Sequence, residues 1–250
     1  LPMIKPYAAK LLKYKVDGIS VCGSTGECRY MTVEKREQVL DAWLKEVKGK
    51  MLVISQIGGC SWEDSMALGK YAVDKGVDAV GSIAPYDTPF ADAGQLVDYL
   101  EPIAKAVAPL PFYYYHILAI THLEVSMVEF LKEAERRMPN LGGYDEMLLS
   151  GLAMGAQGGV GSTYNYCCPV YSKLMDAFEK GEIKAAQDAH YESVKMVEII
   201  MPLGCGVRGG KAVMKLAGLD CGNCRGSLEP FSDADLKDTE EKLKALGLIS

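Results

Sequence analysis

Short apolar runs alternate with amphipathic stretches along the first half of the chain, and this rhythm limits the folds open to it. The apolar runs lie at residues 17–22, 51–57, 78–83 and 111–117, and helical periodicity follows at 32–47, 62–74, 93–107 and 122–137. Strands that helical crossovers bury on both faces need such runs, so we expect a parallel α/β sheet. No G-x-G-x-x-G sequence follows any run, which favours a (β/α) barrel over a doubly wound dinucleotide-binding sheet.

The rhythm breaks after residue 141. The sequence predicts one further strand at 158–163, and helices at 147–154, 169–180, 183–201, 210–217 and 233–246. A closed barrel has eight strands, whereas only five clear ones and a stub near 141–144 can be assigned, so strands are missing before Leu1 and between Asn140 and Gly143. We therefore predict an incomplete TIM (β/α)8-barrel over residues 1–165 and a C-terminal helical extension of the same domain over 166–250.

The helix expected at 32–47 has a clear start and an apolar stripe. Thr32 is placed to cap its N-terminus, and Leu40 is expected on its inner face. Arg36 is expected to face outward.

The charge balance narrows the expected partners. The net charge is −6 and no basic stripe is present, which argues against nucleic acid as a partner. No apolar run approaches the roughly 18–20 residues that span a bilayer, and no signal-peptide pattern opens the sequence. We expect a cytoplasmic protein that does not bind membranes.

Eight cysteines are scattered along the chain, as in proteins of the reducing cytosol. Cys221 and Cys224 have the spacing of metal ligands, but no second Cys or His pair accompanies them at zinc-site spacing. Two thiols in a late loop are the better interpretation, so we predict neither a metal nor a cofactor.

Two strand ends carry side chains suited to chemistry. Ser24 and Thr25, within the sequence GSTGE at residues 23–27, offer hydroxyl and backbone donors to a small carboxylate, although a glycine-rich turn without a ligand is equally compatible. In the run YYYHI at 113–117, alternation sends Tyr113 and Tyr115 to one face of the sheet. A tyrosine at a barrel mouth is suited to proton transfer, and aromatic packing against a helix is the alternative.

Two later segments are rich in polar groups. Gly143, Asp145 and Glu146 belong to a GYDE sequence at a predicted strand-to-helix corner, where acids bind a polyhydroxylated substrate or merely favour a helix N-terminus. Ser162 lies in the sequence GSTYN, a second hydroxyl-rich strand end.

In this order, GSTGE, YYYHI, GYDE and GAQGGVGSTYN (155–165) closely resemble the N-acetylneuraminate lyase family, the sialic-acid branch of the dihydrodipicolinate synthase-like class I aldolases. The resemblance covers the whole chain apart from the missing segments. GSTGE alone marks the superfamily, whereas YYYHI followed by GYDE and GSTYN is specific for the lyase branch.

The resemblance implies a homotetramer of TIM barrels that takes part in sialic acid catabolism. The family reversibly cleaves N-acetylneuraminate to N-acetylmannosamine and pyruvate through a lysine Schiff base. Ser24 and Thr25 match the pair that holds the pyruvate carboxylate, and Tyr115 matches the proton-transferring tyrosine. The contacts to the rest of the sugar match Gly143, Asp145, Glu146 and Ser162. Tyr86 weakly matches a residue near a neighbouring subunit's site.

The lysine that the family places in a G-[IL]-K-[FYQ]-[ST] strand has no counterpart here. That strand would follow the helix after YYYHI, but the sequence passes directly from Leu141 to the GYDE corner, a loss of about 25–30 residues for such a unit. Substitutes are poorly placed, because Lys50 precedes its strand, Lys132 lies on an outer helix, and Lys211 and Lys215 lie in the tail helices. We expect the chain to be inactive as written and to fold poorly or with an open barrel.

Three interpretations follow from the resemblance. The chain is an N-acetylneuraminate lyase whose sequence lacks a segment, through splicing, a gene-model error or truncation. Alternatively, it is a non-catalytic relative that binds sialic acid or keto acids, or joins lyase oligomers. A third interpretation is a related pyruvate-dependent aldolase with another acceptor.

Overall fold

The computed structural model describes residues 1–115, 117–121, 123, 145–156, 158–204, 206–247 and 249. The chain divides into two compact units, one formed by Leu1–Val16 with Tyr144–Ser250 and the other by Asp17–Gly143. We call these unit 1 and unit 2, and each is described by itself. The predicted boundary at residue 165, with both parts in one domain, stays a prediction.

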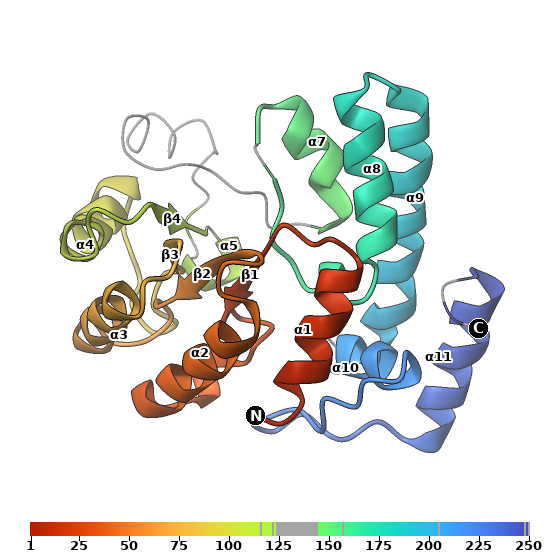
Figure 1. Cartoon of the computed structure of the whole chain (residues 1–250), viewed down its shortest axis with the longest axis horizontal. Coiled ribbons are helices and arrows are strands. Elements are labelled where there is room, and N and C mark those ends of the chain that lie inside the picture. The colour runs from red at the N-terminus through yellow and green to blue at the C-terminus, as the bar shows by residue number, and fades with distance from the viewer. Residues whose placement is uncertain are drawn as a thin grey trace. The chain divides into compact units, whose positions relative to one another are not determined.

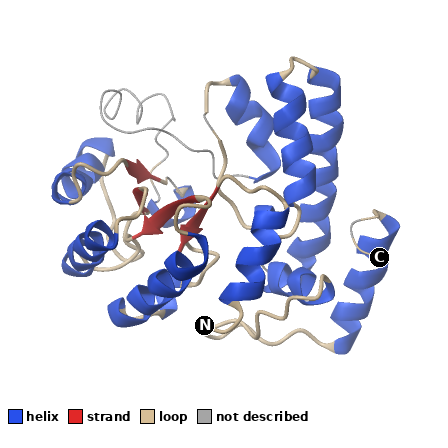
Figure 2. Ribbon diagram, in the orientation of Figure 1, coloured by secondary structure: helices blue, strands red, loops and turns tan. Residues whose placement is uncertain are grey.

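Unit 2 contains a parallel sheet of four strands in the order β1-β2-β3-β4 (Figure 2). The strands are β1 (Gly18–Val21), β2 (Leu52–Gln56), β3 (Ala79–Ser82) and β4 (Phe112–Tyr114). Each lies within one of the predicted apolar runs, so the sequence located all four. The parallel α/β fold predicted from the alternation is confirmed.

Three long helices connect the strands and lie along one face of the sheet (Figure 1). They are α2 (Val33–Val47), α3 (Trp62–Lys75) and α4 (Ala93–Ala106), and a short helix α5 (Leu118–Thr121) follows β4. Each long helix begins after a side chain that accepts a backbone N–H: Thr32, Ser61 and Asp92. The Thr32 cap is therefore confirmed, while the predicted helix at 122–137 lies mostly outside the described residues.

The two faces of this sheet differ in burial. Phe112 and Tyr114 are 5% exposed, whereas Tyr113 and Tyr115 are half-buried, as the predicted alternation requires. A Cβ on Gly69 of α3 would lie 3.3 Å from the Ile57 side chain, which follows β2. The closely packed face is thus the one that the helices cover. Burial raises the pKa of the Tyr114 phenol well above its usual range.

Arg36 corrects one prediction, because it faces inward and is 3% exposed. Its guanidinium donates to the Gln56 carbonyl at 2.6 Å and to the Gly58 carbonyl at 3.2 Å. It also contacts Cys60 Sγ at 3.4 Å. The arginine faces inward because the guanidinium supplies hydrogen-bond donors to these buried carbonyl groups at the end of β2.

Unit 1 is helical. Its helices are α1 (Ile4–Lys13), α7 (Leu148–Ala153), α8 (Cys168–Glu179), α9 (Ile183–Ile200), α10 (Gly206–Leu216) and α11 (Asp233–Ala245). The long helices α8 and α9 pack side by side (Figure 1) around a core that includes Leu174, Met196, Ile200 and Leu243. The five helices predicted after residue 146 are confirmed, whereas α1 was not predicted.

The strand predicted at 158–163 is wrong. The described residues of this segment form only an isolated bridge at Gly159, and a 3-10 turn, η3 (Thr163–Asn165), begins where the strand should end. Three of the six residues are glycines, which weaken a strand. In addition, the Thr163 N–H is taken by the Asp145 carboxylate at 2.8 Å, so it does not join a ladder.

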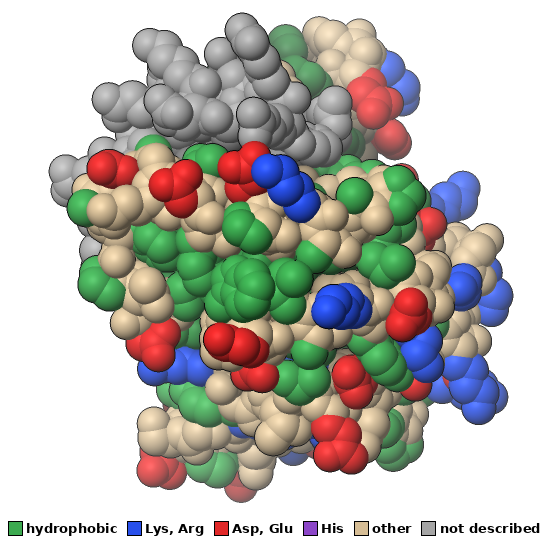
Figure 3. Space-filling view, turned by 90° about the vertical axis from the view of Figure 1, so that its left-hand side faces the viewer, with side chains coloured by type: hydrophobic (Ala, Val, Ile, Leu, Met, Phe, Trp, Pro, Cys, Tyr) green, Lys and Arg blue, Asp and Glu red, His purple; other side chains and the backbone are tan. Residues whose placement is uncertain are grey.

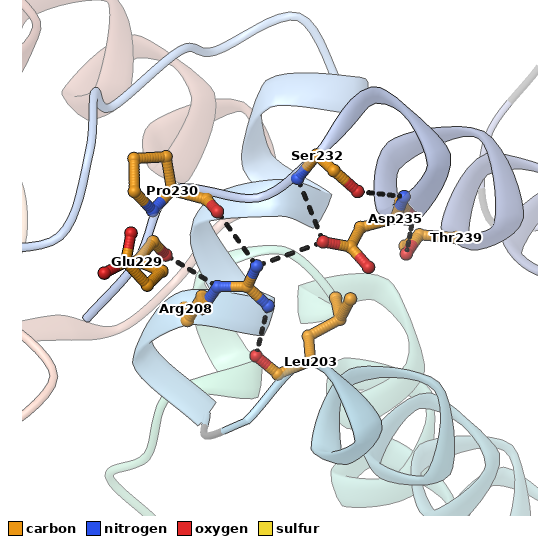
Figure 4. Close-up of polar contacts among 7 residues, drawn as sticks. All are labelled: Leu203, Arg208, Glu229, Pro230, Ser232, Asp235 and Thr239. Atoms are coloured by element: carbon orange, nitrogen blue, oxygen red, sulfur yellow. Dashed lines mark hydrogen bonds and ion pairs between the residues drawn. The ribbon is translucent and has the colours of Figure 1, made fainter.

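Arg208 of α10 anchors the start of α11 (Figure 4). Its guanidinium donates to the Leu203, Glu229 and Pro230 carbonyls at 2.6, 2.8 and 3.0 Å, and pairs with Asp235 at 3.0 Å. The same carboxylate accepts the Ser232 N–H at 2.9 Å while the Ser232 hydroxyl accepts the Asp235 N–H at 3.1 Å, which is a capping box.

The surface is mixed in character. Acidic, basic and hydrophobic side chains are interspersed on the face shown in Figure 3. No helix in the described part of the chain is long and apolar enough to span a membrane.

Candidate active site

The GSTGE loop follows β1 in unit 2 and is bracketed by two strained residues. Cys22 and Glu27 have φ angles of 62° and 61°, in the left-handed region that non-glycine residues rarely adopt. Between them, the Glu27 N–H donates to the Ser24 carbonyl at 2.9 Å and the Cys28 N–H to the Gly23 carbonyl at 3.4 Å. Such strain persists where surrounding contacts hold it, and it is typical of ligand-binding loops.

Ser24 is the better prepared of the two predicted carboxylate ligands. Its Oγ is buried and receives no hydrogen bond of normal geometry from the described residues, whereas Thr25 is exposed. Buried polar atoms are nearly always hydrogen-bonded, so an open Oγ at the carboxyl end of a strand is suited to a ligand. Whether the loop binds a ligand or is a turn without one stays a prediction.

Tyr86 packs beside this loop within its own chain. Burial and the Cys28 thiol raise the pKa of Tyr86, while its interaction with the Ser24 side chain opposes the rise. That interaction does not satisfy Ser24 Oγ as a hydrogen bond of normal geometry. The Arg29 guanidinium lies 5.0 Å from the Tyr86 ring centroid. The predicted place of Tyr86 near a neighbouring subunit stays a prediction.

Tyr115 lies at the same, carboxyl end of the sheet as Ser24 and Thr25. It follows β4, its N–H donates to the Ser82 carbonyl at 2.8 Å, and it is half-buried. Because β2 and β3 separate β1 from β4, the two groups stand three strand spacings apart, about 14 Å across a flat sheet. His116, the next residue of the motif, lies outside the described residues.

Asp145 is the most constrained of the predicted sugar contacts that belong to unit 1. It is 6% exposed, and its Oδ2 accepts the Thr163 N–H at 2.8 Å and the Thr163 hydroxyl at 2.6 Å. Its Oδ1 is buried and accepts no hydrogen bond of normal geometry from the described residues, although the Ser162 side chain interacts with this carboxyl and lowers its pKa. Burial raises the pKa of this carboxyl, and the two Thr163 hydrogen bonds oppose the rise.

The other predicted sugar contacts are less constrained. Ser162 is half-buried, and its side chain lowers the pKa of Tyr166 against a large rise that burial causes. Glu146 is exposed in the 3-10 turn η2 (Asp145–Met147), which leads into α7. Gly143 lies outside the described residues, so the structure places three of the four sugar contacts.

Several residues of this site escaped the sequence prediction. Tyr171 shares a 2.5 Å hydrogen bond with the Thr163 hydroxyl. The Tyr7 hydroxyl donates to Asn165 Oδ1, and Asn165 Nδ2 donates to the Ser162 carbonyl at 2.8 Å. Thr163 and Asn165 belong to the GSTYN motif and could have been found from it, whereas nothing in the sequence pairs Tyr7 or Tyr171 with it.

No lysine occurs in strands β1–β4. Lys50 precedes β2, Lys211 and Lys215 lie on α10, and Lys132 is outside the described residues. Burial lowers the pKa of Lys10 on α1, but its Nζ lies 3.8 Å from Met214 Sδ, and a helix supplies it instead of a strand end.

A metal site is likewise not found among the described residues, since no three His, Cys, Asp or Glu side chains lie together as ligands. No disulfide joins the seven cysteines that the structure describes, and Cys221 and Cys224 are half-buried in the loop after α10.

Comparison with known proteins gives a consistent result. The sequence profile of the dihydrodipicolinate synthetase family matches residues 4–136 and 119–246. The N-acetylneuraminate lyase of Rattus norvegicus is 30% identical over 280 aligned positions, which take in 100% of this chain and 88% of the relative.

Two solved structures extend the likeness to the fold. Proteus mirabilis N-acetylneuraminate lyase has a TM-score of 0.89 at 29% identity, covering 99% of this chain and 92% of that one. A catalytic lysine mutant of Ruminococcus gnavus sialic acid aldolase has a TM-score of 0.88 at 24% identity, covering 98% and 89%. The chain therefore belongs to the dihydrodipicolinate synthetase family, in which it is similar to carbon–carbon lyases of the N-acetylneuraminate lyase type.

Proposed function

We propose that this chain derives from an N-acetylneuraminate lyase, retains the contacts for keto acid and sugar, and lacks the lysine that would make it an aldolase. In the full reaction, a lysine amine condenses with the keto carbon, and the protonated imine accepts the electron pair as the carbon–carbon bond breaks. The observation that carries the proposal is the absence of lysine from all four described strands, beside polar groups that remain in place.

The retained groups fall into two sets, one for the keto acid and one for the sugar. Ser24 and Thr25 are proposed to hold the carboxylate, because the open Ser24 hydroxyl can donate to it. Tyr115, at the same end of the sheet, is proposed to transfer the proton. Asp145, Glu146, Ser162 and Gly143 are proposed to bind the remaining hydroxyl groups of the sugar.

The alignments support the loss of a segment. The alignment to the rat lyase spans 280 positions although this chain has only 250 residues, so about thirty positions of the relative face no residue here. The two family matches overlap at residues 119–136, as expected if this segment aligns with two consecutive units of the family. A lost strand–helix unit of this size would carry the Schiff-base lysine with it.

The sheet supports an incomplete barrel. Within the described residues, β1 and β4 each pair with one neighbour and leave their outer edges unpaired. We propose an incomplete (β/α)8 barrel over residues 1–165 with a helical extension over 166–250, in a cytoplasmic homotetramer as the lyase family implies. The cysteines, none of which forms a disulfide where the structure describes it, fit a reducing compartment.

Ligand binding measured apart from turnover tests this proposal. We expect the 250-residue chain to bind pyruvate and N-acetylmannosamine, detected by saturation-transfer NMR, and to release no pyruvate from N-acetylneuraminate. Ser24→Ala should weaken pyruvate binding and leave sugar binding unchanged, and Asp145→Asn should weaken sugar binding and leave pyruvate binding unchanged. Turnover by this chain, or binding of neither ligand, would overturn the proposal. Turnover with shorter keto acids alone would favour an aldolase with another acceptor.

A further inference from the structure

We propose that Thr163, held by Tyr171, is a positioning residue that fixes one oxygen of Asp145 and leaves the other to a ligand hydroxyl. The inference rests on the proposed function for the sugar itself, whereas the geometry of the three side chains stands on its own. The GSTYN motif draws attention to Thr163 without giving it a role, and Tyr171 lies eight residues along the chain.

The two oxygens of Asp145 have different surroundings. Oδ2 accepts both the backbone N–H and the hydroxyl of Thr163, at 2.8 and 2.6 Å. Oδ1 is buried and accepts no hydrogen bond of normal geometry from the described residues, and it occupies the space that a Cβ on Gly161 would fill. The Ser162 side chain interacts with the same carboxyl, so Ser162 and the ligand hydroxyl would share the Oδ1 side. A buried carboxylate oxygen with lone pairs to spare favours a donor from outside the chain, and a sugar hydroxyl is such a donor.

The hydroxyl groups form a chain with one direction. Because ionised Asp145 can only accept, the Thr163 hydroxyl must donate to it, and Thr163 Oγ1 then accepts from the Tyr171 hydroxyl at 2.5 Å. Each hydroxyl polarises the next, which strengthens the bond to the carboxylate. The order Tyr171–Thr163–Asp145 thus favours the charged form of a carboxyl that burial alone would neutralise.

Tyr171 is fixed in turn by the core of unit 1. It lies on α8, is 3% exposed, and its ring centroid is 4.1 Å from that of Tyr164. Its hydroxyl therefore cannot follow Thr163 if the loop moves. This rigid support is what a binding carboxylate needs, since a misplaced oxygen loses the hydrogen bond that selects its ligand.

The test compares Thr163→Val, which keeps the shape and removes the hydroxyl, with Thr163→Ser, which keeps the hydroxyl. Two readouts are the pKa of Asp145, from the pH dependence of its carboxyl carbon NMR shift, and the affinity for N-acetylmannosamine at pH 7. We expect Thr163→Val to raise the pKa of Asp145 and to lower the affinity for N-acetylmannosamine at least about 10-fold. In Thr163→Ser the Asp145 pKa and the sugar affinity should match those of the parent chain. Tyr171→Phe should change both in the same directions as Thr163→Val, but by less.

Pyruvate binding is the internal control and should be unchanged in all three variants. An unchanged Asp145 pKa and unchanged sugar affinity in Thr163→Val would overturn the inference. If the parent chain binds no sugar, the proposed function fails for the sugar, and the response of the Asp145 pKa still decides the positioning role. If Thr163→Val does not fold, Thr163→Ser and Tyr171→Phe carry the same comparison.

Discussion

Gly161 and Asp145 approach so closely that a Cβ at position 161 would lie 1.5 Å from Asp145 Oδ1. The open carboxylate oxygen occupies the volume that any other residue would need for its side chain. The relationship joins two segments sixteen residues apart, the GYDE corner and the GSTYN loop, into one polar site.

Gly161→Ala is expected to displace the Asp145 carboxylate and to weaken N-acetylmannosamine binding at least about 10-fold, because the hydrogen bonds to Thr163 cannot survive the shift. Isothermal titration of the sugar measures the effect. Gly151→Ala, in helix α7, is the matched control, since among the described residues its Cβ would meet the Ala156 Cβ at an ordinary contact distance of 3.7 Å. Equal affinities in the two variants would contradict this account of Gly161.

Arg36→Ala is expected to destabilise unit 2 by about 3 kcal/mol, because the Gln56 and Gly58 carbonyls would lose their donor inside the fold. Urea unfolding followed by circular dichroism measures the change. Lys45→Ala, on the exposed face of the same helix, should stay within about 0.5 kcal/mol of the parent. A similar loss in both variants would show that Arg36 has no special role.

The start of α11 is expected to loosen in acid. The pKa of Asp235 is lowered first by the Ser232 N–H and then by the Arg208 guanidinium. The stability that ionised Asp235 contributes is therefore fully present above its unfolded pKa of about 3.9. That contribution is lost as the pH falls through the lower folded value. The protection of amides against hydrogen exchange, corrected for the intrinsic pH dependence of exchange, should therefore fall in α11 before α9 as the pH is lowered, and in Arg208→Ala it should be lower at neutral pH as well. If neither acidification nor Arg208→Ala alters the protection of α11, the role given to the Arg208–Asp235 pair is contradicted.

Within the part of the chain that the structure describes, no strand pairs with the outer edges of β1 and β4, and we expect these edges to cost stability. Inserting the lysine-bearing strand and helix of a lyase relative after Asn140 should raise the melting temperature and sharpen the transition, measured by calorimetry. An insert of the same length made of Gly and Ser is the control and should not do so. If the 250-residue chain already melts as cooperatively as a complete barrel, the open-barrel account is wrong.

The sequence predicted the four strands because strands covered on both faces must be apolar, and that requirement is local. Arg36 was assigned to the outside because it is charged, although it shares a helical stripe with Leu40, four residues on. The Gln56 and Gly58 carbonyls, to which Arg36 donates, come close to this side chain only when the chain is folded. The same reason explains the error at 158–163, where the Thr163 N–H is taken by a carboxylate eighteen residues earlier.

The site residues divide in the same way. Motifs predict Ser24, Thr25, Tyr115 and Asp145, because the residue types themselves suit the proposed chemistry, and their roles stay predictions. Tyr171 and Tyr7 were missed because their roles depend on the packing of α8 and α1, and a tyrosine in an amphipathic helix carries no signal for this.

The central claim is that this chain has no lysine able to form a Schiff base with pyruvate. Borohydride reduction in the presence of labelled pyruvate tests it most directly, because the reduced imine is a stable secondary amine that mass spectrometry can locate. We predict no adduct on the 250-residue chain and one adduct on the chain with the lysine-bearing segment inserted. An adduct on the parent chain, mapped to Lys10 or any other lysine, would contradict the account.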